Sequence, residues 1–220
     1  MKVIVTGASG MVGEGVLLEC LKDPRVSSLI VVGRKPCGYT HPKLREVLHK
    51  DFCNLAPIEK DLVGYDACFF CLGVSSVGMS KEDYKKMTYD LTLEMAQRLK
   101  SLNPDLTFCY VTGMHTNENS KRNWARVKGI TENKLRSLFK NAYMFRPGGM
   151  YATPGQRNLK KGYKTFELIG FPILKLFMSG AFCRLEEVGQ AMITCAEKRP
   201  QKHILEVADI KALAWLCSKQ

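Results

Sequence analysis

The stretch that decides the fold is Lys2-Val-Ile-Val-Thr-Gly7-Ala-Ser-Gly10-Met-Val-Gly13, an apolar run followed at once by three evenly spaced glycines. Gly7 permits a sharp strand-to-helix turn, Gly10 lets a pyrophosphate approach the backbone, and Gly13 lets the following helix pack against the strand. Free N–H groups at a helix start attract anions, so the turn predicts dinucleotide binding. A tight turn without a ligand is the alternative. The expected contacts are Gly7, Ser9, Gly10, Met11, Val12 and Gly13.

Apolar runs of strand length alternate with helical patterns along the rest of the chain. Strands are expected at 2–6, 28–32, 45–50, 66–71, 106–112, 142–145 and 203–207. Helices are expected from Gly10 to Asp23-Pro24 and at 80–102, 120–140 and 185–197. This alternation is typical of a doubly wound parallel sheet, the Rossmann α/β architecture, here as one domain over residues 1–220. Within it we expect 147–200 to form a small C-terminal substrate or flap region.

The composition is that of a folded globular protein. Apolar residues make up 45% of the chain and charged residues 25%, which excludes disordered and fibrous classes. The 33 Lys and Arg residues outnumber the 21 Asp and Glu residues, so the net charge of +12 would attract anions. The basic residues stand in small groups without interleaved aromatic residues, so we expect a small-molecule partner and no nucleic acid.

Nine cysteines are present, an odd number, mostly within apolar segments. Because the sequence opens directly on a strand-like run, we expect no signal peptide before them. Reduced thiols in the cytoplasm are therefore expected. Cys68 and Cys71 have the spacing of a redox or zinc pair, but residues i and i+3 of a strand face opposite sides of a sheet. We expect core packing for both and no metal site.

The longest apolar stretch, residues 166–183, does not predict a membrane span. It contains Glu167, Pro172 and Lys175, which a spanning helix would have to bury in hydrocarbon. A flap over a site is the main interpretation. Contact with a membrane surface or with a second copy of the chain, giving a homodimer, remains open.

The end of the second strand favours NADP(H) over NAD(H). An NAD site usually has an acidic residue about 20 residues beyond the glycine turn, whereas this chain has Gly33-Arg34-Lys35. Arg34 can hold a 2′-phosphate with a charge-assisted fork, and Lys35 adds a second charge. A solvated turn is the alternative. Asp51, after the third strand, is positioned to accept a hydrogen bond from the adenine amino group.

These motifs together resemble the atypical short-chain dehydrogenase/reductases over nearly the whole chain. They are the glycine-rich turn, Asp51-Phe52, Cys71-Leu72-Gly73 and Phe145-Arg-Pro147-Gly148. The likeness is strongest to the branch that contains the HIV Tat-interacting-protein-type oxidoreductases, through Val127-Lys128-Gly129, Arg146-Pro147-Gly148 and the stretch 198–206. The resemblance implies a Rossmann domain in which Phe52, Cys71, Leu72, Gly73, Pro147 and Gly148 also contact the dinucleotide.

The catalytic residues depart from the family pattern. Most members have a Tyr-x-x-x-Lys pair on one helix face, and the resemblance implies that Lys128 binds the nicotinamide ribose. Trp124 stands where the tyrosine would be, and an indole cannot release a proton at neutral pH. Thr112 is expected to contact the substrate oxygen, and His115 or a water to donate the proton. Tyr151 is a further candidate donor.

The sequence therefore predicts an NADP(H)-binding atypical short-chain reductase that transfers hydride to a small carbonyl or quinone-like substrate. Two alternatives stay open. One is a nucleotide-sugar epimerase or dehydratase, although these enzymes usually need the tyrosine as a base. The other is a non-catalytic dinucleotide sensor, which the loss of that tyrosine favours.

Overall fold

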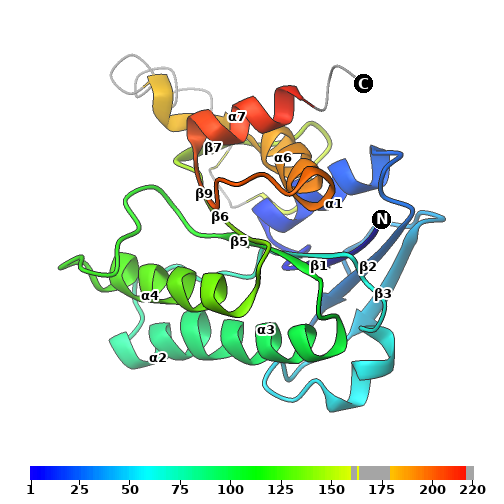
Figure 1. Cartoon of the computed structure of the whole chain (residues 1–220), viewed down its shortest axis with the longest axis horizontal. Coiled ribbons are helices and arrows are strands. Elements are labelled where there is room, and N and C mark those ends of the chain that lie inside the picture. Colours follow the sequence, from blue (N-terminus) through cyan, green and yellow to red (C-terminus); the bar gives the residue numbers. More distant parts are fainter. Residues whose placement is uncertain (160–162, 164–178, 217–220) are drawn as a thin grey trace.

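The computed structural model describes residues 1–159, 163 and 179–216, and these contain a seven-stranded parallel sheet. The strands follow the order β3-β2-β1-β4-β5-β6-β9 (Figure 1). Their bounds are β1 (Lys2–Thr6), β2 (Ser28–Gly33), β3 (Leu44–Leu48), β4 (Ala67–Phe70), β5 (Thr107–Val111), β6 (Ala142–Arg146) and β9 (Ile204–Glu206). All seven predicted strands are confirmed, with ends that differ by one or two residues.

The strand order reverses between β1 and β4. The chain runs outward from β1 through β2 to β3, returns to pair β4 with the other side of β1, and continues to β9. In an open parallel sheet, a crevice forms at such a reversal, outside the carboxyl ends of the strands. The glycine-rich turn leaves the carboxyl end of β1 at this crevice.

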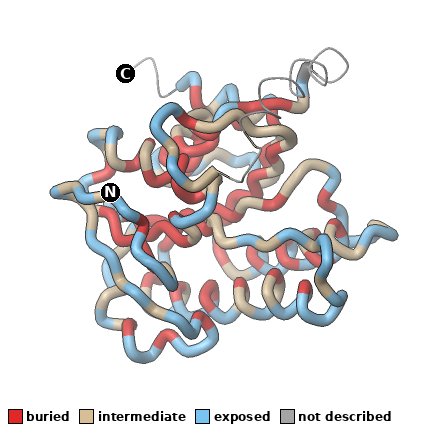
Figure 2. The backbone as a smooth tube through the Cα atoms, turned by 180° about the vertical axis from the view of Figure 1, so that it is seen from behind, coloured by how far each residue is buried: buried red, intermediate tan, exposed pale blue. Residues whose placement is uncertain are grey.

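Helices cover both faces of the sheet, which makes the chain a single doubly wound domain (Figure 1). One face carries α1 (Met11–Lys22), α6 (Leu185–Lys198) and α7 (Val207–Trp215), and the other α2 (Lys81–Lys85), α3 (Leu91–Leu102) and α4 (Asn123–Leu138). Successive strand residues point to opposite faces. Val3 and Val5 of β1 therefore pack with the first group, whereas Ile4 packs with the second. In Figure 2 the buried residues gather in the interior of the molecule and recur at intervals along the helices.

The helix predicted over 80–102 is interrupted. Ser80 caps its start as predicted, because Ser80 Oγ accepts a hydrogen bond from the Asp83 backbone N–H at 3.0 Å. A π-helical segment, η2 (Lys86–Asp90), then separates α2 from α3. Such wide turns interrupt α-helices without a sequence signature, and they occur often at functional sites.

Several short elements were not predicted. They are the 3-10 helices η1 (Ala56–Asp61) and η3 (Ser179–Ala181), the helix α7, and the parallel pair β7 (Gly149–Tyr151) and β8 (Phe182–Arg184). β7 and β8 form a small sheet of their own, so only the approach of two distant segments reveals them. The predicted flap at 166–183 falls mostly on residues 164–178, which lie outside the described part of the chain.

Within the described residues, no helix combines the length and the apolar character needed to cross a bilayer. The same part of the chain contains no cluster of three or more His, Cys, Asp or Glu side chains arranged to hold a metal ion. Cys68 packs on one face of the sheet and Cys71 against the other, as the strand geometry predicts.

Candidate active site

The glycine-rich turn is packed so closely that two of its glycines leave no room for a side chain. Gly7 has φ +73°, and a Cβ there would lie 2.7 Å from the Cys71 backbone. A Cβ on Gly13 would lie 2.2 Å from the Gly7 carbonyl oxygen. Gly10 differs, because its Cβ would approach only Gly7 O, at 3.4 Å. The space above Gly10 is thus available to a ligand.

A cavity of about 790 Å³ opens over this turn. Gly7 and Ser9 line one side of it, and the exposed Arg34 and Lys35 line the side formed by the end of β2. Lys50 adds a third basic residue, and the described lining includes no acidic side chain. Gly10, the N-cap of α1, provides no side-chain cap for the first N–H groups of that helix. The cavity is therefore suited to a phosphate-bearing ligand such as a dinucleotide.

A smaller hollow of about 180 Å³ adjoins the first and shares Arg34, Phe52 and Leu72 with it. Asp51 lines this hollow, and its Oδ1 accepts the Cys53 backbone N–H at 2.9 Å. Gly73, Met87 and Leu91 complete its wall. A mostly apolar hollow with a carboxylate at its rim has the chemistry to take an adenine ring.

Lys128 of α4 lies against the carboxyl end of β5. Its Nζ donates to the Thr112 backbone carbonyl at 2.8 Å. Burial lowers the pKa of Lys128 from 10.5 to about 8, and the nearby Glu132 carboxylate opposes this shift. The same edge of the sheet thus carries both the cavity over the glycine turn and this lysine.

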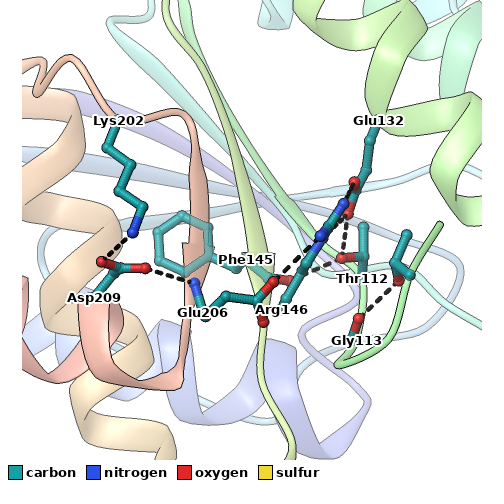
Figure 3. A network of polar contacts seen from close by, with 9 residues as sticks. Thr112, Gly113, Glu132, Phe145, Arg146, Lys202, Glu206 and Asp209 are labelled. Atoms are coloured by element: carbon teal, nitrogen blue, oxygen red, sulfur yellow. Dashed lines mark hydrogen bonds and ion pairs between the residues drawn. The ribbon is translucent and has the colours of Figure 1, made fainter.

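The Thr112 hydroxyl points to a buried carboxylate (Figure 3). Thr112 Oγ1 donates to Glu132 Oε1 at 2.6 Å, and Glu132 is also paired with Arg146. Arg146 in turn reaches Glu206 at 3.2 Å (Figure 3). A hydroxyl has one proton to donate, so donation from Thr112 to a substrate carbonyl oxygen would require this hydrogen bond to be exchanged.

The remaining predicted catalytic residues differ in how far they are buried and in what they contact. His115 is exposed and has φ +68°, a left-handed conformation that is uncommon for a non-glycine residue. Trp124 is half-buried, one turn before Lys128 on α4. Tyr151 packs its ring 6.0 Å from that of Phe182. The identity of the proton donor, either His115, a water molecule or Tyr151, therefore stays a prediction.

Pro147 and Gly148 contact neighbouring segments of the protein itself. The Pro147 carbonyl accepts the Met114 backbone N–H at 3.0 Å, which ties the loop after β5 to the end of β6. A Cβ on Gly148 would lie 2.1 Å from the Ala181 carbonyl oxygen, so this glycine allows the β7 and β8 segments to meet. Their contact with a dinucleotide stays a prediction.

Three residues of the site were missed by the sequence reasoning. Glu132 follows Lys128 by four residues on the same helix face, and that spacing was a usable signal. Glu14 is a carboxylate among the buried residues of α1, and its position was a weaker signal. Asn158 lines the large cavity from a distant part of the chain, and nothing in the local sequence indicates it.

Comparison with known proteins agrees with the fold. No family model matches the chain. Protein HTATIP2 of Rattus norvegicus is 26% identical over 149 residues, which cover 66% of this chain and 61% of that protein. The chain thus spans about three fifths of the length of this curated relative.

Two solved structures resemble the fold of this chain. The ADP-L-glycero-D-manno-heptose-6-epimerase of Helicobacter pylori superposes with a TM-score of 0.69 at 16% identity, over 97% of this chain and 80% of that chain. The enzyme WbmF of Bordetella bronchiseptica, solved in complex with NAD⁺, gives 0.66 at 17%, over 99% and 77%. The chain therefore shares the Rossmann fold of these two enzymes.

Proposed function

We propose that this chain is an NADP(H)-dependent oxidoreductase related to the HIV Tat-interacting-protein-type branch, acting on a small carbonyl or quinone-like substrate. The observation that carries the proposal is the basic cavity over the glycine-rich turn. Arg34 and Lys35 line it where an NAD site would have a carboxylate. The similarity to protein HTATIP2 supports the choice of branch.

Each of these residues has a role in cofactor binding or in the reaction. Arg34 binds the 2′-phosphate through a charge-assisted fork, and Asp51 accepts from the adenine amino group. Lys128 holds the nicotinamide ribose and stabilises negative charge that develops on the substrate oxygen. NADP(H), when bound, supplies or accepts the hydride. The proton comes from His115 or from a water molecule, because Trp124 has no acidic proton at neutral pH.

Two observations favour a second candidate, a non-catalytic dinucleotide sensor. The Thr112 hydroxyl donates to Glu132, and Trp124 replaces the acid found in most relatives of this fold type. Both features concern the proposed catalytic residues, and neither Thr112 nor Trp124 lines the large cavity over the glycine-rich turn. An epimerase or dehydratase is a third reading, and several solved structures of similar fold carry such names.

A panel of quinones and aldehydes with NADPH separates these candidates. For an oxidoreductase we expect turnover that Lys128→Met lowers by about 10²-fold or more, the loss typical of one oxyanion-stabilising donor. Trp124→Phe should leave the pH profile unchanged, and Trp124→Tyr should raise activity by restoring a proton donor. NADPH binding without turnover by the wild type and by Trp124→Tyr would favour the sensor. Thermal melts control for folding.

A further inference from the structure

The segment 153–158 crosses the start of α1 and borders the large cavity. Asn158 lines that cavity together with Ser9 of the glycine-rich turn and Arg34 at the end of β2. We propose that the Asn158 side chain binds the phosphate-bearing adenosine half of the dinucleotide, and that Glu14 is the positioning residue that holds Asn158 there. The inference rests on the proposed cofactor, and the experiments below distinguish a failure of the inference from a failure of the proposed cofactor.

Glu14 fixes the segment by hydrogen bonds to its backbone. The Glu14 side chain is fully buried in the first turns of α1. It accepts the Arg157 backbone N–H at 2.7 Å and the Asn158 backbone N–H at 2.8 Å, one on each oxygen. The Tyr39 hydroxyl donates to Glu14 Oε1 at 2.6 Å. A buried carboxylate is costly unless it accepts such bonds, so the helix and the segment stabilise each other.

Two further anchors flank Asn158. Gln156 Nε2 donates to the Met11 carbonyl oxygen at 2.6 Å, at the first residue of α1. The Arg157 guanidinium lies over the Tyr39 ring at 4.7 Å and donates to the Gly38 carbonyl oxygen at 2.9 Å. These contacts fix the backbone of residue 158 relative to both the glycine-rich turn and the loop after β2.

The side chain of Asn158 is not needed for this anchoring. The fold uses its backbone N–H, which every residue except proline would supply. The amide is half-buried at the cavity wall and makes no hydrogen bond to another described residue. An amide NH₂ donates two hydrogen bonds, and the described residues of the lining include Arg34, Lys35 and Lys50 but no acid. Phosphate and ribose oxygens are the acceptors that fit this position.

Calorimetric titration of NADPH and of ADP tests the side chain. Asn158→Asp should weaken both ligands by about tenfold or more, because it replaces a donor with a charge that repels phosphate. Asn158→Ala should weaken both by a smaller factor. Asn141→Asp introduces the same charge just before β6, at the amino ends of the parallel strands and so away from the cavity. It should have no effect on binding. Unchanged affinity in both Asn158 variants would overturn the inference.

Glu14→Gln tests the positioning role. We expect faster hydrogen exchange at the Arg157 and Asn158 amides, together with weaker NADPH binding. In a double-mutant cycle, Glu14→Gln should weaken binding in the wild type and have little effect on Asn158→Ala. Equal effects in both backgrounds would refute positioning through Asn158. A wild-type chain that binds neither NADPH nor NADH would instead refute the proposed cofactor itself.

Discussion

Two regions at the carboxyl edge of the sheet are built in different ways. Around β1 and β2, the backbone forms the site, with Gly7 and Gly13 in contacts too short for any Cβ. Around β5 and α4, side chains form the site, through the buried network of Thr112, Glu132 and Arg146 (Figure 3). The first region keeps the glycine spacing typical of dinucleotide-binding turns, whereas in the second Trp124 stands four residues before Lys128 on α4.

The difference shows which part of a Rossmann site can change. A backbone-built site depends on the absence of side chains, so almost every substitution there meets a clash. A side-chain network can be rebuilt, because one hydrogen-bonded group can replace another as long as no buried polar atom is left unpaired. The region around the glycine-rich turn is therefore the more constrained of the two, and the region around β5 and α4 can accept more substitutions.

The largest expected effect separates two glycines of the same turn. Gly13→Val should not fold, because its Cβ would lie 2.2 Å from the Gly7 carbonyl oxygen. Gly10→Val should fold and lose dinucleotide binding, because its Cβ occupies the open space above the turn. Circular dichroism and calorimetry distinguish the two outcomes. Normal NADPH binding by Gly10→Val would place the cofactor elsewhere.

Glu132→Ala tests whether the catalytic region is held by its buried network. The substitution leaves Arg146 only the more exposed Glu206 and the Thr112 hydroxyl only the Phe145 carbonyl oxygen. Because breaking a buried pair costs about 3–5 kcal/mol, we expect a loss near the lower end of that range. Denaturant unfolding measures this loss. Glu118→Ala, at an exposed loop position, is the control and should change the free energy of unfolding by at most about 0.5 kcal/mol. A loss as small as that of the control would mean that the network is not structural.

Arg34→Ala tests the cofactor preference of the first region. We expect NADPH binding to weaken by about 1.5–3 kcal/mol, the range for a hydrogen bond to a charged group, and NADH binding to stay unchanged. The exposed Arg136 of α4 provides a control for the change in net charge. Equal losses for NADPH and NADH would show that Arg34 does not bind the 2′-phosphate.

A further expected effect is a pH dependence from Lys128. Its pKa is lowered to about 8 by burial, so the ammonium form is lost as the pH rises above that value. The ratio kcat/KM should be constant below pH 8 and fall above it. Lys128→Arg should move this fall beyond pH 10, because a guanidinium stays protonated. An alkaline limb at the same pH in both proteins would assign it to another group.

The same shift has a consequence for stability. Between pH 8 and 10.5 the unfolded chain binds more protons at Lys128 than the folded chain does. The contribution of this group to the free energy of unfolding should therefore rise with pH in that window. Lys128→Met removes the rise, which thermal melts over the same window can detect.

Local patterns in the sequence determined the strands and the main helices of this protein. Strand-length apolar runs and helical periodicity predicted the sheet and its main helices, because each pattern follows from side-chain geometry along one element. The turn at Gly7, Gly10 and Gly13 predicted the cavity for the same reason, since its contacts involve neighbouring segments of one βα unit. Arg34 was found because the end of β2 has a fixed relation to that turn.

Only the tertiary structure decided which side chains meet across the fold. Asn158 reaches the cavity because Glu14, about 140 residues earlier, accepts its backbone N–H, and no local pattern encodes such a contact. Thr112 lies next to Glu132 because α4 packs on β6, the neighbour of β5 in the sheet. A sequence states which groups are available, whereas long-range packing and the need to pair buried polar atoms decide how they are used.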